Sequence, residues 1–172
     1  MSKKSGSVAY PGHMNGDDEI INLLNEQLTA ELTAISQYFL HAKMQEDWGF
    51  TGLAEHTRAE SFEEMRHAER LTDRILFLEG LPNYQRLSPL RVGQTVPEQI
   101  NADLTVEMEA IGRLRSGIEL MRSRRDVTSA RIFEMILEDE EDHVDYLETE
   151  LELIEKLGEQ LYLQRYAEPS GD

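Results

Sequence analysis

The sequence predicts an all-α protein: four long helices packed as a bundle, with one long crossover and a short fifth helix near the C-terminus. Two observations predict this class. Apolar residues recur at three- and four-residue spacing through four long segments, while Pro and Gly interrupt them sparsely and no alternating strand pattern appears. Short connections join the segments in pairs and a long connection separates the two pairs, which sets the topology.

The first pair of helices is expected at Asp18–Asp47 and Thr51–Glu79. Gly49 follows the first helix as a stop signal, and Gly80 is the expected C-cap of the second. Because so few residues join them, the two helices must be antiparallel neighbours. Their inner stripes are apolar: Leu24, Leu28, Ile35, Tyr38 and Ala42 on the first, and Leu53, Leu71, Ile75 and Leu78 on the second.

The second pair begins at "TVPE", where Thr95 and Glu98 are expected to form a capping box with Pro97 in the first turn. The fourth helix opens near Asp126 and runs to Leu157, and a short fifth segment covers about 159–166. The inner stripes are again apolar: Ile100, Leu104, Ile111, Leu114, Ile118 and Met121 on the third helix, and Ile132, Ile136, Leu147, Leu151 and Ile154 on the fourth.

The long connection, Leu81 to Thr95, decides how the pairs are related. A helix of about thirty residues is about 45 Å long at 1.5 Å per residue. About fifteen extended residues reach about 50 Å, so this connection is able to run the whole length of the bundle. The second and third helices are therefore expected to be parallel.

Composition limits the partners. With 34 acidic and 17 basic residues the net charge is −17, so cations are expected partners and nucleic acid is not. The absence of cysteine excludes disulfides and thiolate metal sites. No apolar run is long enough to span a membrane, and the first thirteen residues lack the apolar region of a secretory signal. We expect a cytoplasmic protein with no membrane partner, comprising a flexible extension (1–16), one domain (17–168) and a tail (169–172).

The inner stripe of each long helix is interrupted by residues that ordinarily avoid a protein core. Buried carboxylates are costly unless they are paired or bind a metal. A single Glu-x-x-His on an acidic helix is usually a solvated face, but here two such pairs lie within apolar stripes. The interrupting residues are Glu31, Glu64, His67, Glu107, Glu140 and His143.

These six residues repeat with one offset. Glu107 follows Glu31 by 76 residues, and the two Glu-x-x-His pairs, at 64–67 and 140–143, are also 76 apart. In a bundle of this topology the repeat corresponds to a two-fold axis along the core. Four-helix di-iron and di-manganese proteins hold two metals with this arrangement. Oxygen and imidazole ligands without sulfur suit iron or manganese, and zinc less well, and two such metals suit two-electron chemistry with dioxygen or peroxide.

Met65 lies between Glu64 and His67 but points away from them, because each residue of a helix turns about 100°. It is either a solvent-facing or subunit-packing methionine, or an axial ligand to haem shared across a two-fold interface. Tyr38 is either a hydrogen-bond donor near the metals, a redox-active phenol or a packed core residue. The remaining histidines considered, at positions 13, 41 and 56, are expected on the surface, and Trp48 packs at the end of the first helix.

Over residues 14–165 the sequence resembles the bacterioferritins. The resemblance rests on four long and specific motifs: "NEQLTAELTAISQYFLHAKM" (25–44), "AESFEEMRHAERLTDRILFLEGLPN" (59–83), "ADLTVEMEAIGRL" (102–114) and "LEDEEDHVDYLETELELI" (137–154). It implies a ferritin-like fold and a hollow shell of twenty-four subunits, made of this chain alone or mixed with a second subunit type. All six metal positions match. The chain departs from some members at Ala59, where they carry a histidine.

The resemblance also implies an activity. Fe(II) would be oxidised by dioxygen or peroxide at two irons per subunit, bound by Glu31, Glu64, His67, Glu107, Glu140 and His143, and stored as a ferric mineral. Haem b, shared between two subunits through Met65 of each, would be reduced by a small ferredoxin for iron release. Two alternatives remain open: a small di-iron or di-manganese enzyme without storage, and a non-enzymatic haem-binding subunit of a mixed shell.

Overall fold

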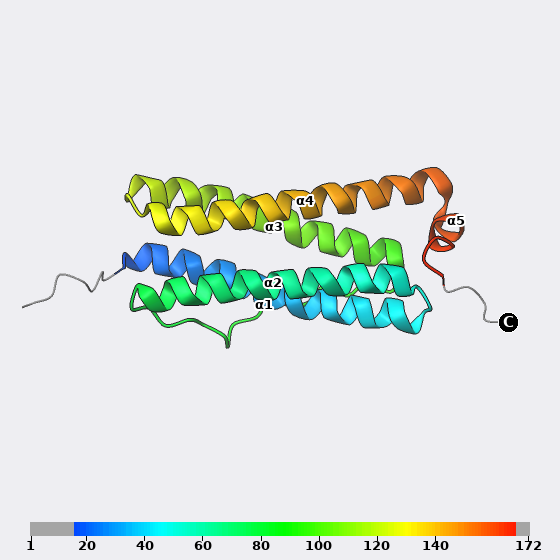
Figure 1. The fold of residues 1–172 in the computed structure, drawn as a ribbon, viewed down its shortest axis with the longest axis horizontal. Helices are drawn as coiled ribbons and strands as arrows, with labels where there is room; N and C mark the ends of the chain where they lie inside the picture. Colours follow the sequence, from blue (N-terminus) through cyan, green and yellow to red (C-terminus); the bar gives the residue numbers. More distant parts are fainter. Residues whose placement is uncertain (1–15, 168–172) are drawn as a thin grey trace, which may run out of the picture.

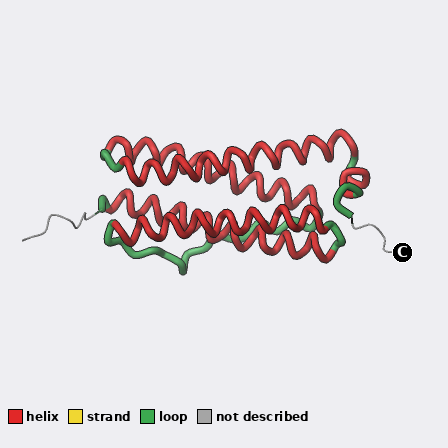
Figure 2. Tube along the Cα trace, viewed as in Figure 1, coloured by secondary structure: helices red, strands yellow, loops and turns green. Residues whose placement is uncertain are grey.

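The structure is a computed structural model in which residues 16–167 are described, and over this range the chain is helical, with no strand (Figures 1 and 2). The predicted all-α bundle with a short fifth helix is confirmed. The extension expected at 1–16, apart from Gly16, and the tail expected at 169–172 lie outside the described residues. The helices are α1 (Asp18–Asp47), α2 (Thr51–Phe77), α3 (Val96–Ser123), α4 (Val127–Leu157) and α5 (Glu159–Leu163).

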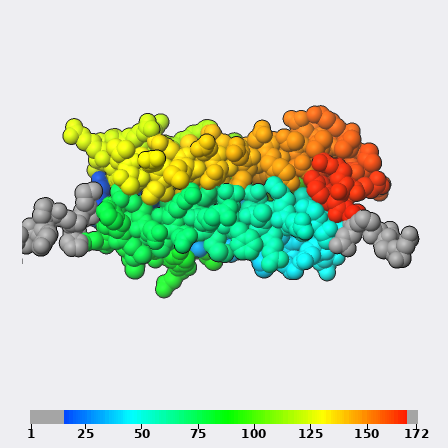
Figure 3. Space-filling model, viewed as in Figure 1, coloured from blue at the N-terminus to red at the C-terminus, as the bar shows by residue number. Residues whose placement is uncertain are grey.

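The helices pack as two antiparallel pairs. α1 lies along α2, α3 lies along α4, and the pairs meet through contacts of α1 with α3 and of α2 with α4. α2 and α3 run in the same direction, because the crossover, residues 78–95, passes along the bundle before α3 begins (Figures 1 and 2). On the face shown in Figure 3 the side chains of α2 and α4 meet and cover the interior. Within the described range, no helix combines the length and apolar character needed to cross a membrane.

The end of α2 differs from the prediction. The helix ends at Phe77, and the left-handed residue that follows it is Glu79 (φ 61°), not Gly80. The Gly80 N–H donates to the Ile75 carbonyl (2.9 Å) and the Glu79 N–H to the Leu76 carbonyl (3.0 Å), a Schellman motif. Gly80 is needed for space instead, because a Cβ there would lie 2.8 Å from Cγ2 of Ile21.

The start of α3 is capped nearly as predicted. The Thr95 hydroxyl accepts from the Glu98 N–H (3.4 Å), but the Glu98 carboxylate accepts from the Gln94 N–H (2.8 Å) and not from that of Thr95. α4 begins at an Asp126 cap, whose carboxylate accepts from the Ser129 N–H (3.0 Å). Both caps satisfy backbone donors that a helix start leaves unpaired.

A polar face of α1 holds the crossover in place. Asn25, Thr33, Gln37 and His41 are separated by multiples of four residues, so they lie along one ridge that winds gradually around α1, here called its polar face. Each bonds backbone groups of the crossover: Asn25 to the Leu81 carbonyl (3.2 Å) and the Asn83 N–H (2.8 Å), Thr33 to the Ser88 N–H (3.0 Å), Gln37 to the Arg91 N–H (2.9 Å) and His41 to the Gly93 N–H (3.1 Å).

The expectation that His41 lies on the surface is wrong, because its side chain is fully buried. Its Nε2 accepts from the Gly93 N–H, so its Nδ1 carries the proton and donates to the Asp103 carboxylate (3.0 Å). Burial raises the pKa of Asp103, opposed by the bonds from His41 and Gln37. A histidine in this polar face therefore joins α1, α3 and the crossover.

α5 is anchored to the bundle by a buried carboxylate. Gly158, at φ 78°, allows the chain to turn sharply between α4 and α5. Tyr162 is fully buried, and its hydroxyl donates to Glu150 of α4 (2.5 Å). The Tyr166 hydroxyl donates to the same carboxylate oxygen (2.7 Å). The short helix is thus held by packing and by two hydrogen bonds.

Candidate metal centre

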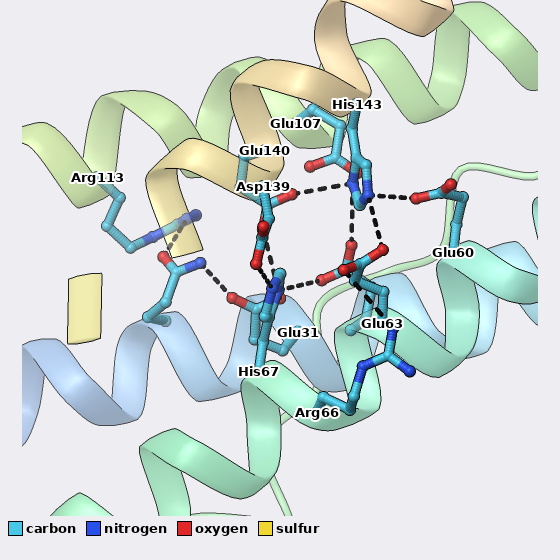
Figure 4. A network of polar contacts seen from close by, with 12 residues as sticks. Glu31, Glu60, Glu63, Arg66, His67, Glu107, Arg113, Asp139, Glu140 and His143 are labelled. Atoms are coloured by element: carbon cyan, nitrogen blue, oxygen red, sulfur yellow. Dashed lines mark hydrogen bonds and ion pairs between the residues drawn. The ribbon is translucent and has the colours of Figure 1, made fainter. Parts of the chain in front are cut away.

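The six residues predicted to bind metal meet in the middle of the bundle, between two apolar clusters. Figure 4 shows how Glu31, His67, Glu107, Glu140 and His143 face one another there. One cluster surrounds Leu28, Leu71 and Phe133, and the other surrounds Leu53 and Tyr162. Each long helix directs its polar residues inward because they fall in its apolar stripe. All six are buried: Glu31 on α1, Glu64 and His67 on α2, Glu107 on α3, and Glu140 and His143 on α4.

The six side chains form two overlapping groups of candidate ligands. Glu31, Glu64, His67 and Glu140 form the first, and Glu64, Glu107, Glu140 and His143 form the second, with the ligand atoms of each group within 4.8 Å of one another. Glu64 and Glu140 belong to both. We name the first group the His67 position and the second the His143 position.

The distances reproduce the two-fold relation of the sequence repeat. Nδ1 of His67 lies 3.1 Å from Glu64 Oε2, 3.5 Å from Glu140 Oε1 and 3.7 Å from Glu31 Oε2. Nδ1 of His143 lies 3.2 Å from Glu140 Oε2, 3.5 Å from Glu64 Oε1 and 3.8 Å from Glu107 Oε1. Each position therefore has its own Glu and His and shares two carboxylates with the other.

The cluster holds protons where it has no metal. Burial raises the pKa values of Glu31 and Glu107 well above the usual value of a glutamate. Repulsion by the neighbouring charges of Glu64 and Glu140 raises them further. Burial alone would raise the pKa of Glu64, but hydrogen bonds from Glu31, His143 and His67 lower it well below its usual range.

The imidazoles are the cations of the cluster. Burial alone would lower the pKa of His67 and His143, but hydrogen bonds to the surrounding carboxylates raise it far above its usual value. An imidazole must lose its proton to bind a metal. Divalent cations bound here would therefore displace the imidazole protons and take over their role of balancing the negative charge of the carboxylates.

The outer nitrogen of each imidazole faces further carboxylates. Nε2 of His67 lies 3.0 Å from Asp139, and Nε2 of His143 contacts Glu60 and lies 3.7 Å from Glu63 (Figure 4). Asp139 follows Glu63 by 76 residues, so this pair obeys the same repeat. Such partners fix the orientation of a ligating imidazole. The sequence prediction missed them, although the offset of the repeat would have found two of the three.

Glu31 has a partner of its own that the sequence did not indicate. The Gln27 amide donates to Glu31 Oε1 (2.6 Å) and accepts from Arg113 (3.3 Å). Gln27 is fully buried. One ligand of the His67 position is therefore held by a fixed hydrogen-bond network from α1 and α3.

Met65 lies outside this centre, on the exposed face of α2. Its side chain is 50% exposed, and it lines a groove of about 710 Å³ with apolar neighbours from three elements. These neighbours are Leu32 and Ile35 of α1, Phe62 of α2 and Tyr84 of the crossover.

The other residues singled out from the sequence are not among the candidate ligands. Tyr38 is buried beside Glu107 and His143. His56 is half-buried near Glu60 (3.3 Å), and Trp48 is 36% exposed at the end of α1. His13 lies outside the described residues.

Comparison with known proteins gives consistent matches along the chain. The ferritin-like domain family matches residues 21–157. The bacterioferritin of Streptomyces coelicolor is 67% identical over 163 residues, which cover 92% of this chain and 98% of that protein. Bacterioferritin BfrA of Mycobacterium tuberculosis is 64% identical over 149 residues, covering 87% of this chain and 94% of that protein.

Solved structures agree. The structure of Mycobacterium tuberculosis bacterioferritin BfrA aligns with a TM-score of 0.89 and 61% identity, covering 90% of this chain and 98% of that one. A Rhodobacter capsulatus bacterioferritin, described as having a metal-free dinuclear site and haem iron in a crystallographic special position, aligns with a TM-score of 0.90 and 45% identity. That match covers 92% of this chain and 99% of the other.

The bundle and its central layer of carboxylates and imidazoles define a ferritin-like protein. The similarity to individual relatives is narrower and extends over nearly the whole chain. The chain belongs to the bacterioferritin family, as its motifs predicted, and its relatives support iron storage as the general function.

Proposed function

We propose that this chain oxidises Fe(II) at its buried centre and stores the product as a ferric mineral inside a shell of identical or mixed subunits. The observation that carries the proposal is the pair of overlapping buried ligand groups that share Glu64 and Glu140. The donors are carboxylate oxygens and imidazole nitrogens, a set that suits iron. Similarity to bacterioferritins supports the same assignment.

The charge of the ligand set suits a pair of Fe(II) ions as substrate. Four carboxylates carry four negative charges, which balance two divalent cations once His67 and His143 have lost their protons. Two adjacent irons supply one electron each, which together reduce dioxygen to peroxide or peroxide to water. Two ferric ions carry two positive charges more than the four carboxylates balance, and this excess favours transfer of the product to the mineral.

The side chains around the ligands maintain the geometry. Asp139, Glu60 and Glu63 hold the outer nitrogens of the imidazoles, so that Nδ1 of each ring faces the centre. Gln27 fixes Glu31 in the same way. The buried position excludes most water and strengthens these contacts.

The shell, its compartment and its substrate supply belong to the same proposal. We infer a cytoplasmic assembly of twenty-four subunits built from two-fold dimers. Its subunits carry a net charge of −17 each, which attracts Fe(II). The family relationship supports this assembly.

Haem b is proposed to occupy the groove around Met65. A thioether is a known axial haem ligand, and the apolar side chains of the groove would contact the porphyrin. A two-fold axis through the groove would supply a second Met65. A group shared in this way lies on a symmetry element, in agreement with the haem iron of the Rhodobacter capsulatus relative. A small ferredoxin is the proposed reductant for iron release.

Aerobic loading with Fe(II) tests the storage proposal. Iron is added far beyond two ions per subunit, and the protein is separated by size with iron detection. Iron that elutes with a large particle supports storage. Loading that stops near two per subunit while the excess precipitates supports a di-iron enzyme without storage.

A double substitution tests the assigned centre. Glu64→Ala with His67→Ala removes one shared carboxylate and the imidazole of the His67 position, so Fe(II) oxidation is expected to fall by about a hundredfold or more. The variant Lys43→Ala, on the exposed face of α1, serves as the control. Oxidation by the double variant at the parent rate would show that the assigned ligands are wrong.

A further inference from the structure

The two metal positions have equivalent ligands, but their surroundings differ. A cavity of about 30 Å³ adjoins the His143 position. Tyr38, Thr57 and Tyr146 line it together with two ligands, Glu107 and His143. A cavity of this size accommodates one or two water-sized molecules. It therefore adjoins one half of the centre.

The 76-residue repeat shows which residues take the places of three residues that line the cavity, Tyr38, Thr57 and Glu60, at the other position. The residues that correspond to Tyr38, Thr57 and Glu60 are all large and apolar, and all belong to the apolar cluster of the bundle. Each is completely buried. The three are Leu114, Phe133 and Ile136. The repeat thus preserves the ligands and changes what surrounds them.

Within the described part of the chain, hydrogen bonding also differs between the two positions: the Glu of the His67 position is held by a neighbouring side chain, and that of the His143 position is not. Gln27 holds Glu31 at the His67 position (2.6 Å). Its counterpart in the repeat, Asp103, is instead occupied by Gln37 (2.7 Å) and His41 (3.0 Å). Glu107 Oε1 consequently has no hydrogen-bond partner among the described residues.

Tyr38 supplies a polar group to the cavity. Its side chain is 3% exposed, and its hydroxyl has no hydrogen-bond partner within residues 16–167. A buried hydroxyl without a partner is costly, and a small ligand that accepts a hydrogen bond would remove that cost. The corresponding residue at the other position, Leu114, has no such group.

We propose that this cavity is the binding pocket for the small oxygen molecule that the centre reduces, dioxygen or peroxide, and that this molecule approaches the centre at the His143 position. The inference rests on the proposed function. The His67 position, enclosed by apolar side chains and held by Gln27, then serves as the rigid half of the centre. Thr57 is the residue that keeps the pocket open, because its counterpart is a phenylalanine.

Azide, a small linear anion that binds metal ions, is a probe that needs no turnover. The protein as assembled is loaded with Co(II), and the absorption of the bound Co(II) is recorded as azide is added. We expect two Co(II) per subunit and a spectral change in one of them. Thr57→Phe should still bind two Co(II) but lower azide affinity about tenfold or more, because overfilling a packed site is costly.

Thr57→Val is the matched control, since it keeps the size of the side chain and therefore the cavity. We expect it to bind azide as the parent does. If Thr57→Phe loses Co(II), Thr57→Leu replaces it in the same comparison. A Tyr38→Phe variant should weaken azide binding less than Thr57→Phe does, because it removes the hydroxyl and leaves the space.

Two results would overturn the pocket: unchanged azide affinity in the variant that fills it, or an equal spectral response of both Co(II) ions in the parent. Failure of the parent to bind two Co(II) per subunit would instead contradict the proposed centre itself. The two failures are distinguished because stoichiometry and azide affinity come from separate titrations.

Discussion

Protons and metal ions compete for the same atoms at His67 and His143. The carboxylates around each ring would repel one another without a cation between them, so they favour the protonated imidazole, and the pKa of each ring lies far above its usual value. The native state therefore binds protons that the unfolded chain releases near neutral pH. Metal binding must displace these protons.

The stability of the metal-free protein should accordingly fall as the pH rises. The pKa values of His67 and His143 are raised from 6.5, so their contribution to stability is complete below that pH and decreases progressively as the pH rises above it toward the raised pKa. We expect the free energy of unfolding to fall by about 1 kcal/mol per pH unit for each retained proton. Urea unfolding at several pH values between about 6.5 and 8 measures this change. The double variant His67→Gln, His143→Gln should show a shallower slope, left by the raised pKa of Glu31 and Glu107, and an unchanged slope would contradict the assignment.

Met65 allows a direct test of the haem site. Met65→Leu keeps the size and apolar character of the side chain but removes the thioether, so the protein should assemble and lack haem absorption. Met108→Leu, on the exposed face of α3, is the matched control and should retain haem. Haem of unchanged amount in the first variant would exclude Met65 as the ligand.

At the level of elements, the crossover determines the topology of the bundle as much as the helices do. Its backbone groups bond to one polar face of α1, so the segment that makes α2 and α3 parallel has a fixed path. The chain needs such contacts because a long connection without its own secondary structure is entropically costly to order. His41 lies at the point where this path reaches α3.

His41→Ala tests that role. It leaves the Asp103 carboxylate and the Gly93 N–H without their partner in a buried region, so we expect a loss of about 2–4 kcal/mol in the free energy of unfolding. Hydrogen exchange of the Gly93 amide should accelerate as well. Lys43→Ala on the same helix should change stability by less than about 0.5 kcal/mol. Unchanged exchange at Gly93 would show that the crossover is held by other contacts.

Much of the architecture could be predicted at this scale, and the errors have physical reasons. The apolar stripes and glycine positions located all five helices, because the spacing of apolar residues along a helix does not depend on which element packs against it. The end of α2 was misplaced since Glu79, not a glycine, adopts the left-handed conformation. His41 was misplaced because its partners, Asp103 and Gly93, are more than fifty residues away.

At the scale of the whole molecule, two features matter most: the net negative charge and the 76-residue repeat. A net charge of −17 on each subunit should draw Fe(II) by long-range attraction. The six candidate ligands were predictable because the 76-residue repeat doubles the signal of a single Glu-x-x-His. The pocket was not, because it depends on how Thr57 and Tyr38 differ from their counterparts once the chain is folded.

The rate of Fe(II) uptake should therefore depend on salt. Raising ionic strength from about 0.01 to 0.3 M shortens the screening length severalfold, so the initial rate should fall. The number of Fe(II) bound anaerobically at saturation should stay the same, because the buried ligands are little screened. Stopped-flow mixing measures the rate, and an increase with salt would show that the surface charge does not attract the ion.

The anchoring of α5 has a consequence for assembly. Glu150 fixes the tyrosines of the last turns within a single chain, so this end of the subunit is already ordered before a second copy arrives. Association of preformed surfaces avoids the ordering entropy that a segment folding on contact would lose. In a Glu150→Leu variant, the residues of this end would lose their conformational entropy during association instead. The variant subunits should therefore associate more slowly, even where the finished assembly is the same.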